Sequence, residues 1–323
     1  MQAAFTPAYG PADIIEVREV PQPVIGAKDV LIAVQASPVT AGDRRVRAAD
    51  FPSFTVIPGR LLLGISKPSH PVQGTMFAGR VVEVGEAVTR FAVGDDVFGS
   101  ADHGAWAEAM VVSEDGGIAR IPDGFSYAEA AAIPYGAGTA LHFLRDLAGL
   151  QAGESVLILG ASGGVGRYAT QLASSMGAEV TAVCSRDDFE LVRQLGAREV
   201  LDYRSQDFTE NGLKYDVIFD IADASSFSHS RASLTPKGRY LTLYMSTGAL
   251  FWMGWTALTG GAAAKVGVAM GGDMTELAEL LASGAVRPMV AQRFGLQDIV
   301  AAHQEAASGR LHGEIIVEVA GLA

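Results

Sequence analysis

Residues 155–184 read SVLILGASGGVGRYATQLASSMGAEVTAVC, and this stretch decides the fold. The apolar run at 155–160 predicts a buried strand, the spacing of 166–177 predicts a helix, and 179–184 predicts a second strand. A strand, a helix and a second strand in this order form a β-α-β unit, in which the two strands are parallel. The stretch therefore predicts an α/β fold.

The same alternation continues on the C-terminal side of this unit. Helices are expected at 188–196, 226–234 and 273–284, and strands are expected at 198–203, 215–221, 238–244 and 286–290. Strands separated by helices predict a doubly wound parallel sheet that is covered on both faces.

The sequence before residue 113 has a different style. Short β-branched runs such as 29–36 and 79–84 are bounded by Gly and Pro, which predicts a β-rich domain with long loops. The turn-forming cluster at 121–124 separates the two styles, so we expect two domains. The last segment predicts a helix at 296–310 and a strand at 314–320, and the spacing alone allows these to join either domain.

Composition excludes several classes of protein. The 323 residues include 36 acidic and 24 basic side chains, for a net charge of −12, so nucleic acid is not an expected partner. A single cysteine, Cys184, excludes a disulfide scaffold and fits a reducing, cytoplasmic setting. The uncharged stretch 248–264 is short for a bilayer span and is interrupted by glycines, so we expect no membrane-spanning segment.

The turn at 160–166 carries the functional signal. Small residues between a strand and a helix let the backbone approach a pyrophosphate, whose charge is met by free amides at the helix N-terminus. The alternative is a purely structural turn, but the surrounding elements favour dinucleotide binding. The candidate binding residues are Gly160, Ala161, Ser162, Gly163, Gly164, Val165 and Gly166.

The end of the second strand indicates which dinucleotide is bound. Here the chain reads Cys184-Ser185-Arg186, and a hydroxyl with a guanidinium suits the 2′-phosphate of NADPH. The alternatives are that Arg186 is a solvated loop charge and that Asp187 or Asp188 binds the ribose of NAD. We favour NADPH.

At this point the sequence resembles the medium-chain dehydrogenases/reductases, specifically their zinc-free quinone-reductase branch. The subgroup it is most similar to contains the reticulon-4-interacting-protein-like reductases. The resemblance extends over most of the chain and rests on the motifs GTMFAG (74–79), VG (84–85), VTRFAVGDDVFG (88–99), AAIP (131–134), TA (139–140), GASGGVG (160–166) and the closing AH (302–303), SGR (308–310) and GEIIV (313–317).

The resemblance implies a GroES-like catalytic domain, residues 1–122 and 292–323, with a Rossmann domain, residues 123–291, inserted between them. It also implies an active site in the cleft between the domains. In this subgroup, the residues that match Ser162, Gly164, Val165, Ser185 and Tyr203 bind NADPH.

Two departures from the zinc-dependent relatives remove the expected metal ligands. Those relatives carry GHE where this chain has Gly74-Thr75-Met76, and a cysteine near the position of Thr40. We therefore expect no zinc, and a hydride transferred from NADPH to an acceptor that is already electrophilic, a quinone or an α,β-unsaturated ketone.

The resemblance gives three candidates near the nicotinamide: Thr40, Asp43 and Tyr135. Asp43 is equally suited to capping the following helical turn, and Tyr135 to packing beneath the cofactor. Two rival functions stay open. One is an NADPH-binding sensor or assembly factor without turnover, and the other is a zinc-free alcohol or enoyl-thioester reductase.

The aromatic cluster Phe251, Trp252, Met253 and Trp255 suits a substrate pocket, a buried core or a homodimer contact, of which we favour the core or the contact. The six histidines are scattered and have no metal-ligand spacing, and His303 matches the closing AH motif, so we expect a structural role for it.

The missing ligands give a direct prediction. Metal analysis of the purified protein should find no stoichiometric zinc, and chelators should leave the fold and any reductase activity unchanged. One tightly bound zinc ion per chain would contradict it.

Overall fold

The computed structural model describes residues 1–50, 56–268, 271–309 and 311–319. Contacts divide the chain into two compact units. The first unit comprises residues 1–135, 273–282 and 288–323, and the second comprises residues 136–272 and 283–287. Of the range expected for the Rossmann domain, residues 123–135, 273–282 and 288–291 thus pack with the β-rich unit. The domain boundaries at 122 and 292 stay predictions.

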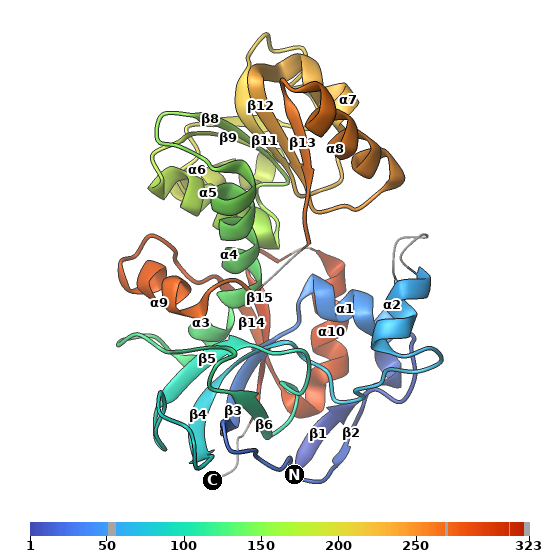
Figure 1. Ribbon diagram of the computed structural model, residues 1–323, viewed down its shortest axis with the longest axis vertical. Helices are drawn as coiled ribbons and strands as arrows, with labels where there is room; N and C mark the ends of the chain where they lie inside the picture. Colours follow the sequence, from blue (N-terminus) through green and yellow to red (C-terminus); the bar gives the residue numbers. More distant parts are fainter. Residues whose placement is uncertain (51–55, 269–270, 310, 320–323) are drawn as a thin grey trace. The chain divides into compact units, whose positions relative to one another are not determined.

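The first unit is β-rich, as Figure 1 shows. Its elements are β1 (Gln2–Phe5), β2 (Glu16–Glu19), β3 (Asp29–Pro38), α1 (Ala41–Ala48), α2 (Val56–Leu63), β4 (Met76–Val84), β5 (Asp96–Ser100), β6 (Ala109–Ser113), β7 (Gly117–Arg120), α3 (Tyr127–Ala131), α9 (Met274–Ala282), β14 (Val290–Gly295), α10 (Ile299–Ser308) and β15 (Glu314–Glu318). Its seven-stranded sheet has the order β14-β15-β3-β4-β5-β7, and β6 also pairs with β3.

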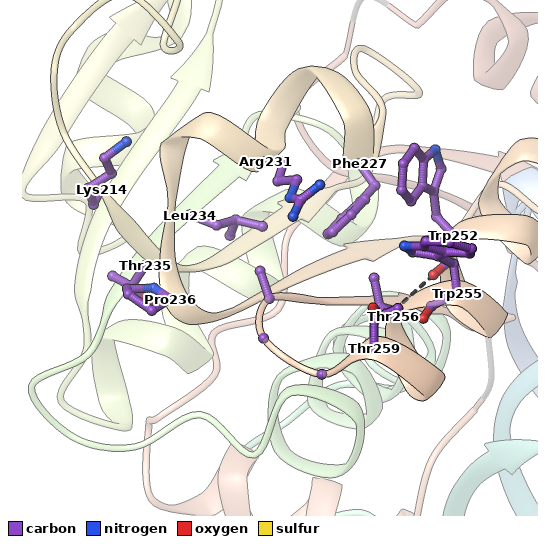
Figure 2. Close-up of a pocket in the computed structure, with 13 residues that line it drawn as sticks. Lys214, Phe227, Arg231, Leu234, Thr235, Pro236, Trp252, Trp255, Thr256 and Thr259 are labelled. Atoms are coloured by element: carbon purple, nitrogen blue, oxygen red, sulfur yellow. Dashed lines mark hydrogen bonds between the residues drawn. The ribbon is translucent and has the colours of Figure 1, made fainter.

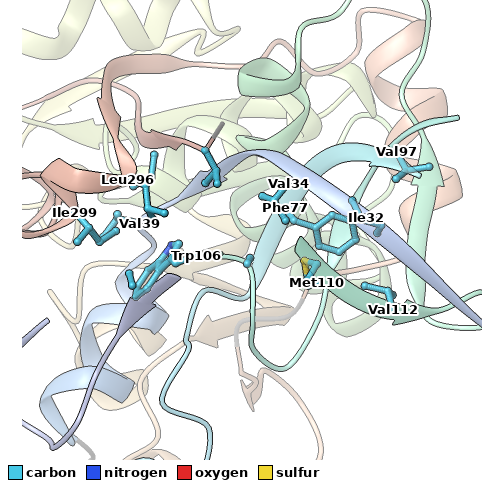
Figure 3. Close-up of a cluster of buried hydrophobic side chains, with 14 of the residues drawn as sticks. Ile32, Val34, Val39, Phe77, Val97, Trp106, Met110, Val112, Leu296 and Ile299 are labelled. Carbon is cyan, nitrogen blue, oxygen red and sulfur yellow. The ribbon is translucent and has the colours of Figure 1, made fainter. Parts of the chain in front are cut away.

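The C-terminal segment returns to this first unit. Strand β15 pairs antiparallel with β3, in a register that places Val317 opposite Ser37. Figure 3 shows the apolar core that results, where Leu296 and Ile299 from the end of the chain join Ile32 and Phe77 from the sheet. Because these side chains are buried together, the two ends of the chain form one folding unit.

The second unit contains the predicted parallel sheet. Its elements are α4 (Pro134–Leu141), which begins at the unit boundary, a π-helical segment (His142–Ala148), β8 (Ser155–Leu159), α5 (Gly164–Ser175), β9 (Glu179–Cys184), α6 (Phe189–Gln194), β10 (Glu199–Asp202), β11 (Tyr215–Asp220), α7 (Phe227–Ser230), β12 (Leu234–Thr242), α8 (Thr247–Thr259) and β13 (Ala263–Val266). All six strands are parallel, in the order β10-β9-β8-β11-β12-β13.

This strand order is that of a Rossmann fold. Counted along the unit it is 3-2-1-4-5-6, so the order reverses between β8 and β11. Ligands of such sheets bind beyond the carboxyl ends of the strands, at the point of reversal. The α/β class and both architectures inferred from the sequence are confirmed.

Two local expectations were wrong. The strand expected at 286–290 is instead β14, residues 290–295, which belongs to the first unit's sheet. Pro288 lies inside the expected span and has no N–H for a ladder, so pairing begins only after it. Also, no strand was expected at 263–266, where β13 forms the sheet's edge.

The aromatic cluster does not fill the core of this chain. Phe251 and Trp255 are 58% and 50% exposed, and Met253 is 37% exposed, so only Trp252 packs against a buried cluster. The core interpretation was therefore wrong for those three side chains. Within the described ranges, no helix has the length and apolar character that a bilayer crossing requires.

Candidate functional site

The turn after β8 depends on two glycines. Gly160 has φ = +85°, a left-handed conformation that side chains disfavour, and a Cβ there would lie 2.9 Å from the Ala222 Cβ. A Cβ on Gly166 would lie 2.1 Å from the carbonyl oxygen of Gly160. Only glycine therefore allows α5 to begin this close to the end of β8.

The N-terminus of α5 presents backbone amides without side-chain caps. Its N-cap is Gly163, which supplies no side-chain hydrogen bond, and Gly163 and Gly164 are exposed. Val165 and Ala161 are buried and anchor the turn, while Ser162 is partly exposed. Uncapped amides and the positive end of the helix dipole suit an anion such as a pyrophosphate.

The end of β9 lies beside β8 in the same sheet. Ser185 donates a hydrogen bond from Oγ to Asp188 Oδ2 at 2.7 Å, and Asp188 is buried. Arg186 and Asp187 are exposed. The Tyr203 side chain is 58% exposed, and its backbone N–H bonds to the carbonyl of Cys184, so the phenol ring lies at the same edge of the sheet.

The first unit carries a second set of polar residues, at the start of α1. Thr40 is the N-cap and Asp43 is the third helical residue, and each side chain bonds to the other's backbone N–H. The hydroxyl of Thr40 also donates to Asp43 Oδ2 at 2.6 Å. Helix capping by Asp43, the structural alternative considered from the sequence, is therefore confirmed.

Asp43 has features that an ordinary cap lacks. Its side chain is only 2% exposed, and the Thr75 hydroxyl donates to its second oxygen, Oδ1, at 2.9 Å. Burial raises the pKa of Asp43, while the hydrogen bonds from Thr40 and Thr75 oppose that shift. Sequence reasoning missed Thr75 as a partner of Asp43, although Thr75 stands at a position where zinc-dependent relatives carry a different residue.

Tyr135 lies against the same helix end. A Cβ placed on Gly42 would lie 3.3 Å from the Tyr135 ring, and a hydrogen bond joins the backbone of Gly42 to the phenol. Burial, with the charge of Asp43, raises the pKa of Tyr135 to about 12. The structure thus brings the three candidates Thr40, Asp43 and Tyr135 together, with a phenol that stays neutral at physiological pH.

A small pocket opens next to this network. It has a volume of about 70 Å³, and its walls include Asp43, Thr75, His70 and His103. The two imidazole rings stack with centroids 3.7 Å apart, and burial lowers the pKa of His103. A buried acid in the wall of a pocket can exchange a proton with a small polar group.

The remaining candidates have structural roles. His303 is buried in α10 with its ring edge-on to Trp106, and burial lowers its pKa to about 3, so it is neutral. Burial raises the pKa of the Cys184 thiol to about 12. The described parts of the chain contain no group of three or more His, Cys, Asp or Glu side chains that could hold a metal ion.

Two family models match the chain. Residues 26–123 match the alcohol dehydrogenase GroES-like domain, and residues 195–317 match a domain described as a zinc-binding dehydrogenase. The β-rich unit, the Rossmann sheet and these matches define a medium-chain dehydrogenase/reductase.

Curated relatives narrow the family further. Quinone-oxidoreductase QR1 of Triphysaria versicolor is 31% identical over 93% of this chain and 92% of its own length. The human mitochondrial NAD(P)H oxidoreductase RTN4IP1 is 31% identical over 76% of this chain and 70% of its own length. The chain therefore belongs to the quinone oxidoreductase family, an enzyme family that uses a nicotinamide cofactor.

A solved structure shares the whole fold. The quinone oxidoreductase of Coxiella burnetii superimposes with a TM-score of 0.85 over 99% of both chains, at 24% identity. That likeness supports the architecture of both units.

The glycine turn gives a prediction. Gly164→Asp should abolish dinucleotide binding while leaving the fold largely intact, because a carboxylate would occupy the exposed start of α5, where we expect the pyrophosphate to bind. Fluorescence titration with NADPH measures the loss. Gly248→Asp, the same change at an exposed glycine in the first turn of α8, serves as the control. Unchanged NADPH affinity in the Gly164 variant would show that the phosphate site lies elsewhere.

Proposed function

We propose that this enzyme transfers a hydride from NADPH to a quinone or an α,β-unsaturated carbonyl compound, without a zinc ion. The observation that carries the proposal is Asp43, a buried acid with a raised pKa that lines a pocket and bonds to the hydroxyls of Thr40 and Thr75. Thr40 and Thr75 stand where zinc-dependent relatives carry ligands, so the same positions hold hydroxyl groups instead.

The residues of the second unit fit NADPH. The uncapped amides at the start of α5 would bind the pyrophosphate. This end of the helix is open because Gly160 and Gly166, which have no side chains, approach each other closely there. Among the described residues, Arg186 has no ion pair and is free for the 2′-phosphate. Asp188, which could have held the ribose of NAD, already accepts the Ser185 hydroxyl. Tyr203 would flank the adenosine.

NADPH, when bound, supplies a hydride, which carries two electrons. The acceptor becomes a hydroquinone or a saturated carbonyl compound once it has also gained a proton. We assign delivery of that proton to the hydroxyl of Thr75, which lines the pocket and would be recharged through Asp43, to which it is hydrogen-bonded. Thr40, which is 1% exposed, would hold the Asp43 carboxyl in place from the other side. Tyr135, as a neutral phenol, orients the acceptor by donating a hydrogen bond.

The relatives support this acceptor class without fixing the compound. An α,β-unsaturated thioester presents the same chemistry as an enone. The Streptomyces halstedii polyketide synthase GfsB is 39% identical over 53% of this chain and 3% of its own length. Enoyl-thioester reduction is therefore the second candidate function. We propose the cytoplasm as the compartment, because Cys184, the chain's one cysteine, is a free, buried thiol.

Cofactor choice gives a prediction. NADPH should bind more tightly than NADH, and Arg186→Ala should weaken NADPH about 10- to 150-fold, since a hydrogen bond between charged groups contributes about 1.5–3 kcal/mol. NADH affinity should scarcely change. Arg198→Ala, at an exposed arginine that pairs with Glu179, is the matched control. Equal losses for the two cofactors, or a wild-type preference for NADH, would refute the assignment.

The proposed proton transfer through Asp43 gives a further prediction. Asp43→Asn should lower kcat about 10- to 100-fold with unchanged NADPH affinity, because Asn keeps the shape but cannot pass on a proton. Since burial raises the pKa of Asp43, its protonated form persists to higher pH than an ordinary carboxyl. The wild-type rate should fall as pH rises through that pKa, and the Asn variant should lose this limb. Asp123→Asn, at an exposed turn, is the control.

A normal rate and an unchanged pH profile in the Asp43→Asn variant would show that Asp43 acts only as a helix cap. A loss of thermal stability without those kinetic changes would reduce it to the same structural role.

A further inference from the structure

The fourth residue of α5, Arg167, is a buried cation that is only 2% exposed. Arginine is rarely buried to this extent, because removing its charge from water is costly. The Nη1 group of Arg167 donates a hydrogen bond to the Ser162 carbonyl oxygen at 3.2 Å. The guanidinium thus reaches back from the helix to the glycine turn that precedes it.

The charge of Arg167 adds to the positive end of the helix. An α-helix carries about half a positive charge at its N-terminus, which favours acidic side chains in the first turn. The first turn of α5 has no acidic side chain, and its N-cap, Gly163, contributes no side-chain hydrogen bond. The start of α5 therefore concentrates positive charge, which an anion bound there would offset.

Arg167 also fixes the orientation of one peptide group in the turn. The carbonyl of this group, that of Ser162, accepts the hydrogen bond from Arg167. Its N–H, that of Gly163, donates to the Gly160 carbonyl at 3.1 Å. A carbonyl that pointed at a phosphate would repel it, whereas the first N–H groups of α5 have no partner within the helix and can donate to a phosphate. The bond to Arg167 therefore keeps a repelling group away from the place proposed for the pyrophosphate.

The helix around Arg167 is anchored independently of this side chain. The backbone N–H of Arg167 donates to the Gly163 carbonyl at 3.0 Å. One turn further along, the Gln171 side chain accepts a hydrogen bond from the backbone N–H of Arg287 at 2.8 Å. A change of the Arg167 side chain should therefore alter the turn and its charge while α5 stays in place.

We propose that Arg167 is a positioning residue for the diphosphate of the cofactor. It would hold the Ser162 carbonyl away from the phosphates and supply a positive charge next to the turn, without touching the cofactor itself. The inference rests on the NADPH binding proposed above and deepens it. Arg186 is assigned there to the 2′-phosphate, which NADH lacks, whereas Arg167 would act on the diphosphate that NADPH and NADH share.

A second pair of cations in the same unit offers a comparison. Figure 2 shows a pocket of about 360 Å³ whose walls include Arg231 and Lys214. Other walls come from the residues that begin β12 and those that precede β13, so the pocket lies at the amino ends of these strands. The glycine turn follows the carboxyl end of β8 in the same parallel sheet. Substitution of Arg231 or of Arg167 therefore distinguishes the two places where an anion could bind.

Titration of the full-length protein with NADPH, NADH and inorganic pyrophosphate tests the proposal. Arg167→Met, which keeps the length of the side chain but removes its charge and its donors, should raise Kd for all three ligands about tenfold. Arg167→Lys, which keeps the charge, should restore most of the affinity. With a quinone acceptor, KM for NADPH should rise in Arg167→Met while kcat at saturating NADPH stays unchanged, because Arg167 acts on cofactor binding.

Two other arginine variants serve as controls. Arg239→Met breaks a partly buried ion pair with Glu154, so it should lower thermal stability while leaving the three affinities unchanged. Arg231→Met removes a cation from the pocket of Figure 2 and should also leave them unchanged. If Arg167→Met does not fold, Arg167→Gln takes its place: it keeps amide donors but no charge, and it should weaken all three ligands.

Several results would overturn the inference and leave the proposed function in place. These are unchanged affinities in the Arg167 variants, a loss confined to NADPH, or an equal loss in Arg239→Met, which would show that lowered stability alone weakens binding. Pyrophosphate binding that is lost in Arg231→Met and kept in Arg167→Met would also overturn it. A wild-type protein that binds none of the three ligands would overturn the proposed cofactor as well.

Discussion

The contact between Gly166 and the carbonyl of Gly160 is the constraint on which the rest of the second unit depends. A Cβ at Gly166 would lie 2.1 Å from that oxygen, so any side chain would push α5 away from β8. With glycine, the helix begins directly above the reversal of strand order, and its uncapped amides face the carboxyl ends of β8 and β9. One steric condition therefore fixes where α5 begins, and with it the place that we propose for the pyrophosphate.

The first unit solves a different physical problem, which is how to keep an acid inside a protein. Asp43 is nearly inaccessible, and it is retained because four donors satisfy its oxygens: the backbone amides and the hydroxyls of Thr40 and Thr75. The cost of desolvation still raises its pKa. The same arrangement that caps α1 places this acid beside a pocket, where we propose that it also takes part in proton transfer.

Much of this could be predicted from residues 155–184, because strand, glycine turn and helix are local patterns with strong steric causes. The pairing of β14 with β15 could not be predicted, since periodicity does not say which sheet a strand joins, and Pro288 displaced its start. The hydrogen bond from Thr75 to Asp43 joins residues 32 positions apart, and no spacing rule connects them. The apolar side chains of α8 also suggested a position in the core from the sequence. In the structure, α8 lies beside the edge of the sheet, so that one face of the helix is exposed.

We propose that this chain is an enzyme that passes hydride from NADPH to an electrophilic acceptor. The most direct test mixes the protein with NADPH labelled with deuterium at the transferable position and a panel of quinones and enones. We predict that NADPH is consumed and that the label appears on the β-carbon of the reduced enone. NADPH that binds with measurable affinity but is not oxidised by any acceptor would contradict the account and favour a nucleotide-binding sensor.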